Sequence, residues 1–233
     1  MRTDDPDVTE VEGPPPLKHP ADAVIEALAP VVTSERLERI RDVARHRTDR
    51  VVVVLDAITD PHNASAVLRS ADAFGVQTVH VIVGPLGFRA SQGVSKGTHR
   101  WIDVVRHADA PACARRLKAD GYSIHVATMG GTHQPRDLAA QSKVALVFGN
   151  EHRGVSGEMT ALADGTFAIP MRGFAESLNV SVAAAIAVHD VTSRVADEMP
   201  TTEQRALEAR FLMNSVKNAD QVIEEHLGNA KRR

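Results

Sequence analysis

Runs of β-branched and aliphatic residues constrain the fold of this chain more than any other feature. Residues 51–55 read Val-Val-Val-Val-Leu, a continuous apolar run typical of a strand buried on both faces of a sheet. Similar runs occupy residues 79–83, 122–127 and 144–148. Helical patterns separate the runs, at about residues 64–74, 109–120 and 156–163. This alternation predicts an α/β fold with a mainly parallel sheet and helices on both faces.

Less regular segments flank the predicted sheet. A triple proline and an acidic run near the N-terminus predict a flexible acidic tail. In the C-terminal segment, Thr201-x-x-Gln204 has the spacing of a capping box and predicts one helix running to about His226. The expected parts are a tail at residues 1–20, an N-terminal helical extension at 21–48, the α/β domain at 49–196 and a C-terminal helical extension at 200–233.

The charge of the chain is unevenly distributed. The formal net charge is −3, and residues 1–12 alone carry −4, which leaves about +1 for the remainder. Six arginines cluster between residues 35 and 50. Such a cluster fits contacts with nucleic-acid phosphates and fits an ordinary solvated helix face equally well, so both interpretations stay open.

Cysteine usage and hydropathy exclude several classes of protein. The single cysteine, Cys113, cannot form a disulfide within the chain, and without a cysteine pair or a His-x-x-x-His spacing the common zinc patterns are missing. We therefore expect no metal. No apolar run approaches ~20 residues and the N-terminus is acidic, so we expect a soluble cytoplasmic protein without a membrane span.

Polar residues follow the predicted strands where ligands bind in such sheets, beyond the carboxyl ends of the strands. Asn63 and Arg69 follow the first strand, Glu151 follows the strand at 144–148, and Ser177 and Asn179 precede a helix rich in alanine. We expect these five side chains to form one composite site. A structural interpretation stays open for each loop: an ion pair from Arg69 to its helix neighbour at 72, a helix cap at Glu151, and caps at Ser177 and Asn179.

Two nucleotide-binding motifs are incomplete. The first loop lacks the Gly-x-Gly-x-x-Gly that a dinucleotide site needs. The spacing of Gly149, Gly154 and Ser156 is similar to a phosphate-binding loop, but Val155 stands where that loop requires lysine. The sequence therefore disfavours a dehydrogenase and a nucleoside triphosphatase.

Three motifs together resemble one known family. They are Asn63-x5-Arg69, Phe-Gly-Asn-Glu-x-x-Gly-Val-Ser at 148–156, and Ile-Pro-Met-x-Gly-x-x-x-Ser-Leu-Asn-Val-Ser-Val-Ala at 169–183. In this order and spacing they are similar to the SpoU/TrmH branch of the SPOUT methyltransferases. The resemblance implies a deep trefoil knot in the C-terminal half of the sheet, a homodimer that packs through the alanine-rich helix face at 182–187, S-adenosylmethionine as cofactor and a ribose 2′-hydroxyl of RNA as acceptor.

The resemblance also implies roles for individual residues. Arg69 matches the catalytic arginine of the family, and we expect the remaining polar site residues to hold it and the ribose in place. The residues expected to position these groups are Asn63, Glu151, Ser177 and Asn179. The residues expected to cradle the cofactor are Thr128, Gly149, Ile169 and Leu178.

The RNA substrate is less closely defined. Three features are similar to those of the enzymes that methylate guanosine 18 in the D-loop of tRNA. They are the flanking helices, Pro61-His62-Asn63 and the stretch at 95–101. Two residues differ from those enzymes. Asp60 stands where they often carry lysine, and Glu176 stands where they usually carry glutamine. Relatives that act on ribosomal RNA share the glutamate at this second position. Methylation of guanosine 18 in tRNA is therefore the expected activity, with methylation of ribosomal RNA as one alternative and a non-catalytic RNA-binding protein as another.

Overall fold

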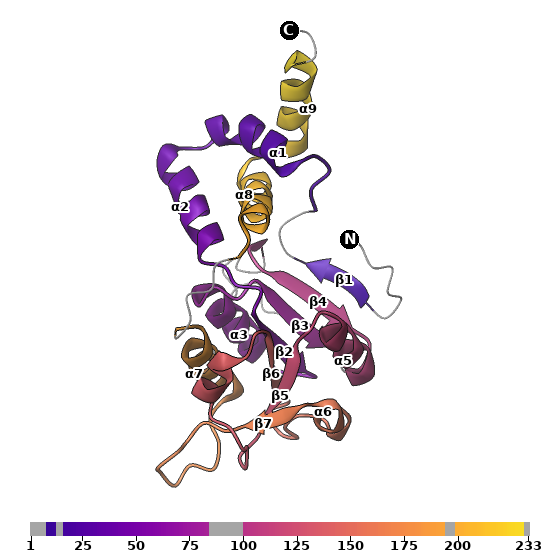
Figure 1. Ribbon diagram of the computed structural model, residues 1–233, viewed down its shortest axis with the longest axis vertical. Coiled ribbons are helices and arrows are strands. Elements are labelled where there is room, and N and C mark those ends of the chain that lie inside the picture. The colour runs from indigo at the N-terminus through magenta and orange to yellow at the C-terminus, as the bar shows by residue number, and fades with distance from the viewer. Residues whose placement is uncertain (1–7, 13–15, 84–99, 194–198, 231–233) are drawn as a thin grey trace. The chain divides into compact units, whose positions relative to one another are not determined.

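The computed structural model describes residues 8–12, 16–83, 100–193 and 199–230. The chain divides into two compact units, one formed by residues 1–12 and 48–196 and the other by residues 13–47 and 197–233. The first unit is an α/β sheet structure and the second is helical (Figure 1). Most of the 95–101 stretch, on which part of the tRNA resemblance depends, lies outside the described residues.

One mixed sheet organises the first unit. Its described strands follow the order β1-β4-β3-β2-β6-β5-β7, in which β2 to β7 run parallel and β1 pairs antiparallel with β4. The strands are β1 (Val8–Glu12), β2 (Val51–Asp56), β3 (Thr78–Ile82), β4 (Asp103–His107), β5 (Ser123–Ala127), β6 (Val144–Gly149) and β7 (Gly165–Phe167). Every residue of β2 is buried, as its continuous apolar sequence predicts.

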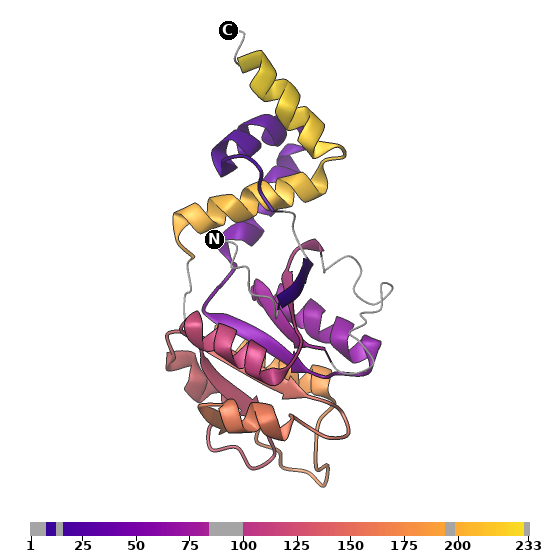
Figure 2. The same ribbon diagram turned by 90° about the vertical axis from the view of Figure 1, so that its right-hand side faces the viewer.

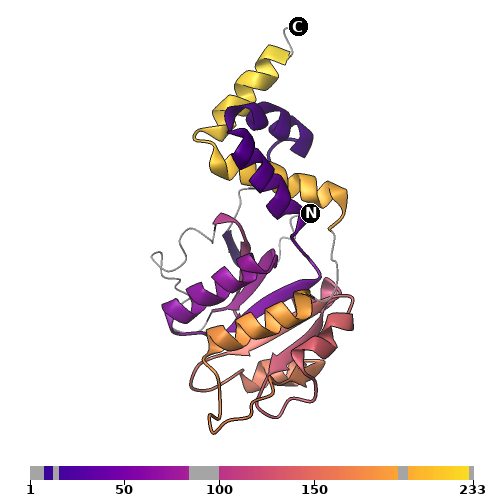
Figure 3. The ribbon, with the colours of Figure 1, turned by 90° about the vertical axis from the view of Figure 1, so that its left-hand side faces the viewer.

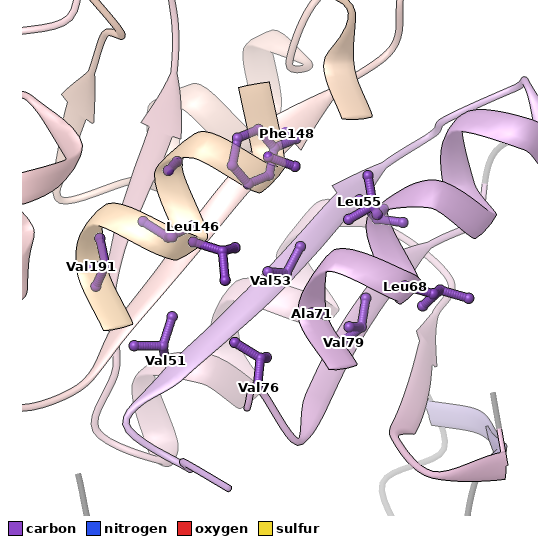
Figure 4. Close-up of a cluster of buried hydrophobic side chains, with 14 of the residues drawn as sticks. Val51, Val53, Leu55, Leu68, Ala71, Val76, Val79, Leu146, Phe148 and Val191 are labelled. Atoms are coloured by element: carbon purple, nitrogen blue, oxygen red, sulfur yellow. The ribbon is translucent and has the colours of Figure 1, made fainter. Parts of the chain in front are cut away.

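Helices cover both faces of this sheet, as the alternation in the sequence predicts. One face carries α3 (Pro61–Ala73) and α7 (Val180–Thr192), seen in Figure 3, and the other carries α5 (Ala110–Ala119) and α6 (Gly157–Leu162), seen in Figure 2. Successive residues of β2 pack on opposite sides. Val51, Val53 and Leu55 join the core under α3 and α7 (Figure 4), and Val52 and Val54 join the core under α5 and α6.

The helical unit contains α1 (Ala21–Leu28), the 3₁₀ turn η1 (Ala29–Val31), α2 (Ser34–Arg45), α8 (Thr201–Ser215) and α9 (Ala219–Ala230). Some members of the arginine cluster have structural contacts here. Arg41 Nε donates to Glu208 Oε1 at 2.8 Å, and the buried Arg47 guanidinium lies 5.8 Å from the centre of the Phe211 ring. Both arginines contact α8, but only the buried Arg47 excludes the solvated-face interpretation, since the side chain of Arg41 is 45% exposed.

The structure differs from the sequence-based expectation in three places. Val8–Glu12 is a strand within the segment expected to be a flexible tail, because the edge of β4 offers it unpaired backbone groups. The expected C-terminal helix is two helices, separated where Asn218 adopts a positive φ of 56°. The capping box is wrong: Pro200 is the N-cap of α8, and the Gln204 amide donates to the Met199 carbonyl. None of the described helices is long and apolar enough to cross a membrane.

Arg50, a partly buried residue just before β2, connects β2, the 3₁₀ helix η3 (Pro135–Ala140) and α7. Arg50 Nη1 donates to the carbonyl oxygens of Ala139 at 3.2 Å and Gln141 at 3.1 Å, around η3. Its Nη2 donates to the Val191 carbonyl at 3.1 Å, near the C-terminus of α7, where a cation also suits the helix dipole.

We predict that Arg50→Ala lowers the free energy of unfolding by about 2 kcal/mol, because it leaves carbonyl groups without a charged donor. Denaturant unfolding monitored by circular dichroism measures the change. Arg136→Ala, at an exposed position of η3, is the matched control and should change the value by less than about 0.5 kcal/mol. Equal stability of the two variants would contradict the role given to Arg50.

Candidate active site

Three polar loops meet at the carboxyl edge of the sheet: the loop after β2, the loop after β6 and the loop before α7. The first two are neighbours because β2 and β6 pair in parallel up to Asp56 and Gly149, so both strands end together. The third loop reaches the same place because α7 packs on the sheet face that also carries α3, and its N-cap Asn179 contacts Asn63. The sheet topology therefore gathers residues that are distant in sequence.

The side-chain amide of Asn63 connects these loops. Its Nδ2 donates to Glu151 Oε1 at 2.9 Å, and its Oδ1 accepts a hydrogen bond from Asn179 Nδ2 at 3.0 Å. The two bonds use the opposite ends of the amide, which defines its orientation. Three of the predicted site residues thus form one hydrogen-bonded chain, from Glu151 through Asn63 to Asn179.

Glu151 is held as a hydrogen-bond acceptor. Burial tends to raise its pKa, but hydrogen bonds from Asn63, from the Glu151 and Thr59 backbones and from the Thr59 side chain outweigh burial and lower the pKa below the ordinary glutamate value. The carboxylate is therefore ionised at neutral pH. It does not cap the following helix, since Ser156 is the N-cap of α6 and its Oγ accepts from the Met159 backbone at 3.2 Å.

Two residues that the sequence did not single out support Glu151. Thr59 Oγ1 donates to Glu151 Oε2 at 3.3 Å, and Asn150 Nδ2 lies 3.3 Å from the same Thr59 oxygen. Asn150 also donates to the carbonyl of Ala57, a residue with a positive φ of 53° that is uncommon outside glycine. Asn150 could have been found from its place beside Glu151 in the second motif, whereas Thr59 carried no signal.

Arg69 lies on α3. Asp60 caps this helix by accepting a hydrogen bond from the His62 backbone at 2.8 Å, which places Asn63 in the first turn and Arg69 almost two turns later. The Arg69 side chain is exposed, and it makes no ion pair or hydrogen bond with any residue that the structure describes. The structural alternative for it, an ion pair with Asp72, is therefore not formed.

The two candidates before α7 behave differently. Asn179 is the N-cap of α7, where its Oδ1 accepts from the Ser181 backbone at 2.8 Å while its Nδ2 donates to Asn63. It is a cap and a member of the polar chain at once. Ser177 is exposed, does not cap the helix and has no hydrogen bond from its side chain to the described part of the protein.

The four expected cofactor residues lie at or just beyond the ends of β5, β6 and β7 and before the start of α7. A Cβ on Gly149 would lie 2.1 Å from the Gly154 carbonyl carbon, so only glycine fits there. The Thr128 backbone N–H donates to the Phe167 carbonyl at 2.9 Å, which ties the loop after β5 to the end of β7. Ile169 is half-buried and Leu178 is exposed, so this edge offers apolar side chains beside bare backbone.

We predict that Gly149→Ala displaces the loop at 150–154 and lowers the free energy of unfolding by about 2 kcal/mol, because the new methyl group overlaps the backbone of Gly154 and Val155. Gly157→Ala is the matched control, since a Cβ there meets no atom within 4 Å. Thermal unfolding of both variants measures the difference. A Gly149→Ala protein as stable as the control would contradict the close approach.

Comparison with known proteins identifies the arrangement. The sequence profile of the SpoU rRNA Methylase family matches residues 50–189. The tRNA (guanosine(18)-2′-O)-methyltransferase of Thermus thermophilus is 38% identical over 155 residues, which cover 66% of this chain and 80% of the relative. The enzyme of the same name from Borreliella burgdorferi is 32% identical over 200 residues, which cover 83% of this chain and 92% of the relative.

Solved structures agree with the sequence relatives. The TrmH/SpoU tRNA modifying enzyme of A. aeolicus superimposes with a TM-score of 0.62 at 26% identity, covering 84% of this chain and 96% of that one. The SpoU methyltransferase AviRb from Streptomyces viridochromogenes, in complex with AdoMet, superimposes with a TM-score of 0.54 at 26% identity, covering 66% and 60%. The resemblance carried by the three motifs is confirmed, and the chain belongs to the SpoU rRNA Methylase family.

Proposed function

We propose that this protein transfers a methyl group from S-adenosylmethionine to the ribose 2′-hydroxyl of guanosine 18 in tRNA. The observation that carries the proposal is the Glu151–Asn63–Asn179 chain at the sheet edge, in a chain that belongs to this family and carries Arg69 on the same helix as Asn63. The two sequence relatives are named as methyltransferases of guanosine 18 in tRNA, and the match to one of them covers 83% of this chain.

The residues at the sheet edge suit the cofactor. Its adenosine has apolar ring faces and polar ring edges, and the site offers the exposed Leu178 and the half-buried Ile169 as apolar side chains, with hydrogen-bonded or close-packed backbone at Gly149 and Thr128. We propose that these four residues hold the cofactor. When bound, S-adenosylmethionine supplies an electrophilic methyl group on a sulfonium centre.

Arg69 is proposed as the catalytic residue. The pKa of a free guanidinium lies above ~12, so arginine is a poor base but a permanent cationic donor. We place it against the phosphate next to the target ribose, where it also stabilises the negative charge that develops on the 2′-oxygen. The hydroxyl proton then passes to water or to that phosphate.

The polar chain has a positioning role. Glu151 fixes the amide of Asn63, and Asn63 in turn fixes Asn179 at the start of α7, so the helix that bears Arg69 and the loop that bears Leu178 keep a constant separation. Holding two reacting groups in line can contribute roughly 7 to 11 kcal/mol. We propose that the exposed hydroxyl of Ser177 contacts the bound nucleotide.

We also propose the trefoil knot and the homodimer of the family. Support for the knot comes from the loop after β5, which hydrogen-bonds along β7 through the backbones of Thr128 and His133. Support for the dimer comes from α7, whose outer face exposes Val182 and Ile186 one turn apart, and from the fully exposed Phe174 in the loop before it. A second copy packed on α7 would cover this apolar surface.

Two other functions remain as outcomes of the test. Methylation of ribosomal RNA is favoured by one observation, Glu176 before Ser177, which relatives acting on ribosomal RNA share. A non-catalytic RNA-binding protein would be expected to lack one of the polar site residues, and all of them are present in this chain.

Transfer of labelled methyl groups from S-adenosylmethionine to total tRNA and, separately, to ribosomal RNA tests the proposed function directly. We expect label in tRNA, mapped to the ribose of guanosine 18. Label in ribosomal RNA alone would keep the chemistry and replace the substrate. Cofactor binding without transfer to either RNA would favour the non-catalytic alternative.

We predict that Arg69→Ala reduces methyl transfer at least about 100-fold, because the developing alkoxide loses its donor. The affinity for S-adenosylmethionine, measured by calorimetry, should stay within about twofold, and Arg69→Lys should recover little of the activity, since a point charge does not replace the planar fork. Arg115→Ala, an exposed arginine on α5 across the sheet, is the control. Substantial activity in Arg69→Ala would reject the assignment.

We predict that Asn63→Ala lowers methyl transfer by about 10- to 100-fold, because Glu151 and Asn179 lose the amide that connects them. The cost in stability should stay below about 1.5 kcal/mol, since these bonds lie near solvent. Ser70→Ala on the same helix removes only a bond to the Ala66 carbonyl and serves as the control. If Asn63→Ala kept the full activity of the control, the hydrogen-bonded chain from Glu151 through Asn63 to Asn179 would have no catalytic importance.

A further inference from the structure

A second cluster of reactive side chains lies inside the sheet unit, outside the polar chain at the carboxyl edge. His80 on β3, His107 at the end of β4 and Cys113 on α5 are all buried, with exposed fractions of 4%, 0% and 0%. One nitrogen or sulfur ligand atom from each residue lies within 4.8 Å of the other two. The proposed methyl transfer uses none of these groups.

The fold brings the three side chains together. His80 pairs with Val105 and Ile82 pairs with His107 in the parallel register of β3 and β4, so the two histidines project from the same face of adjacent strands. Their rings stack with centroids 5.1 Å apart, and His80 Nδ1 lies 2.8 Å from His107 Nε2. Helix α5 begins at the Asp109 cap directly after β4 and returns Cys113 over the same face.

The surroundings of the cluster are mainly apolar. Cys113 is a free thiol packed with residues such as Val54, Ile82 and Leu117. Histidine is only intermediate in its tendency to be buried, and two adjacent buried imidazoles are costly unless their nitrogens are used. Imidazole nitrogen and cysteine sulfur are the donors that zinc binds in proteins, whereas magnesium and calcium prefer oxygen.

We propose that His80, His107 and Cys113 bind one zinc ion. Two neutral imidazoles and one thiolate are the protein ligands, a water molecule would take the fourth tetrahedral position, and the proton of the Cys113 thiol is released to solvent on binding. The site would stabilise the packing of α5 on β3 and β4. It would have no part in the chemistry at the carboxyl edge.

The geometry needs only small adjustments. Ligands at about 2.0 Å for nitrogen and 2.3 Å for sulfur stand roughly 3.3 to 3.7 Å apart around a tetrahedral ion. His80 Nδ1 and His107 Nε2 are 2.8 Å apart and would move apart by about half an ångström. Ligand atoms that are now up to 4.8 Å apart would approach each other by about one ångström. Side-chain torsions can supply these movements without a change of the strands.

A nearby carboxylate can balance the charge of the ion. Asp56 is buried at the end of β2, and its Oδ2 accepts a hydrogen bond from the Ser156 backbone at 2.8 Å. The charges of a divalent ion, one thiolate and this carboxylate sum to zero, which lowers the cost of burying the ion. Arg116 also acts electrostatically on His80, and its own charge is paired with Asp120 at 2.6 Å.

The proposal departs from the expectation of no metal that the sequence raised. That expectation depended on cysteine pairs and closely spaced histidines, whereas these ligands come from three separate elements. Only the pairing of β3 with β4 brings His80 to His107, which stands 27 residues away in the sequence.

The test uses the full-length chain without a histidine tag, dialysed against a weak chelator and analysed for all transition metals by mass spectrometry. We expect about one zinc ion per chain in the wild-type protein and at least about a tenfold loss of zinc affinity in Cys113→Ser. His125→Asn is the matched control, because it removes a buried histidine of β5 from outside the cluster. It should keep the zinc.

A spectroscopic measurement on the wild-type protein does not depend on how the variants fold. Cobalt(II) in the site should give a thiolate-to-cobalt charge-transfer band in the near ultraviolet, and added zinc should abolish the band and raise the melting temperature. The proposal is overturned if wild-type protein takes up neither zinc nor cobalt, if the cobalt band is missing, if only another metal such as copper is bound, or if a folded Cys113→Ser binds zinc as tightly as the wild type.

Discussion

The burial of β2 on both faces is the constraint on which the sheet unit depends. Each residue from Val51 to Asp56 is enclosed, so helices must cover both sides of the sheet and neighbours must pair along both edges of the strand. Parallel pairing with β6 then makes the two strands end together at Asp56 and Gly149. A polar site at this edge follows from the core, because buried parallel strands leave only their ends open to solvent.

The amide of Asn63 turns this open edge into a defined arrangement. Asparagine suits the position because it donates to Glu151 from one end and accepts from Asn179 at the other, which neither a carboxylate nor a hydroxyl group can do in the same geometry. The ionised carboxylate of Glu151 thereby receives its hydrogen bonds from amide and hydroxyl donors and not from an arginine. The guanidinium of Arg69 is left for an anionic ligand such as an RNA phosphate.

The sequence predicted the strands whose own residues form an apolar run. It missed the strands that are defined by pairing with a neighbouring strand. The four mainly apolar runs became β2, β3, β5 and β6, whereas β4 reads Asp-Val-Val-Arg-His and β7 has only three residues, too few for a periodic signal. Three site residues could be placed from topology and the family resemblance. Thr59 could not, because its contact with Glu151 depends on the unusual backbone at Ala57.

Asp56 is the residue at which the buried core meets the polar edge of the sheet. It is the last residue of β2 and is itself buried. Its carboxylate accepts from the backbone of Ser156, the cap of α6, and so fixes the far end of the loop that carries Glu151. The near end of that loop follows β6, which pairs with β2 up to Gly149. Both ends of the loop are therefore held by β2, so the packing of this one strand determines where the Glu151 carboxylate lies.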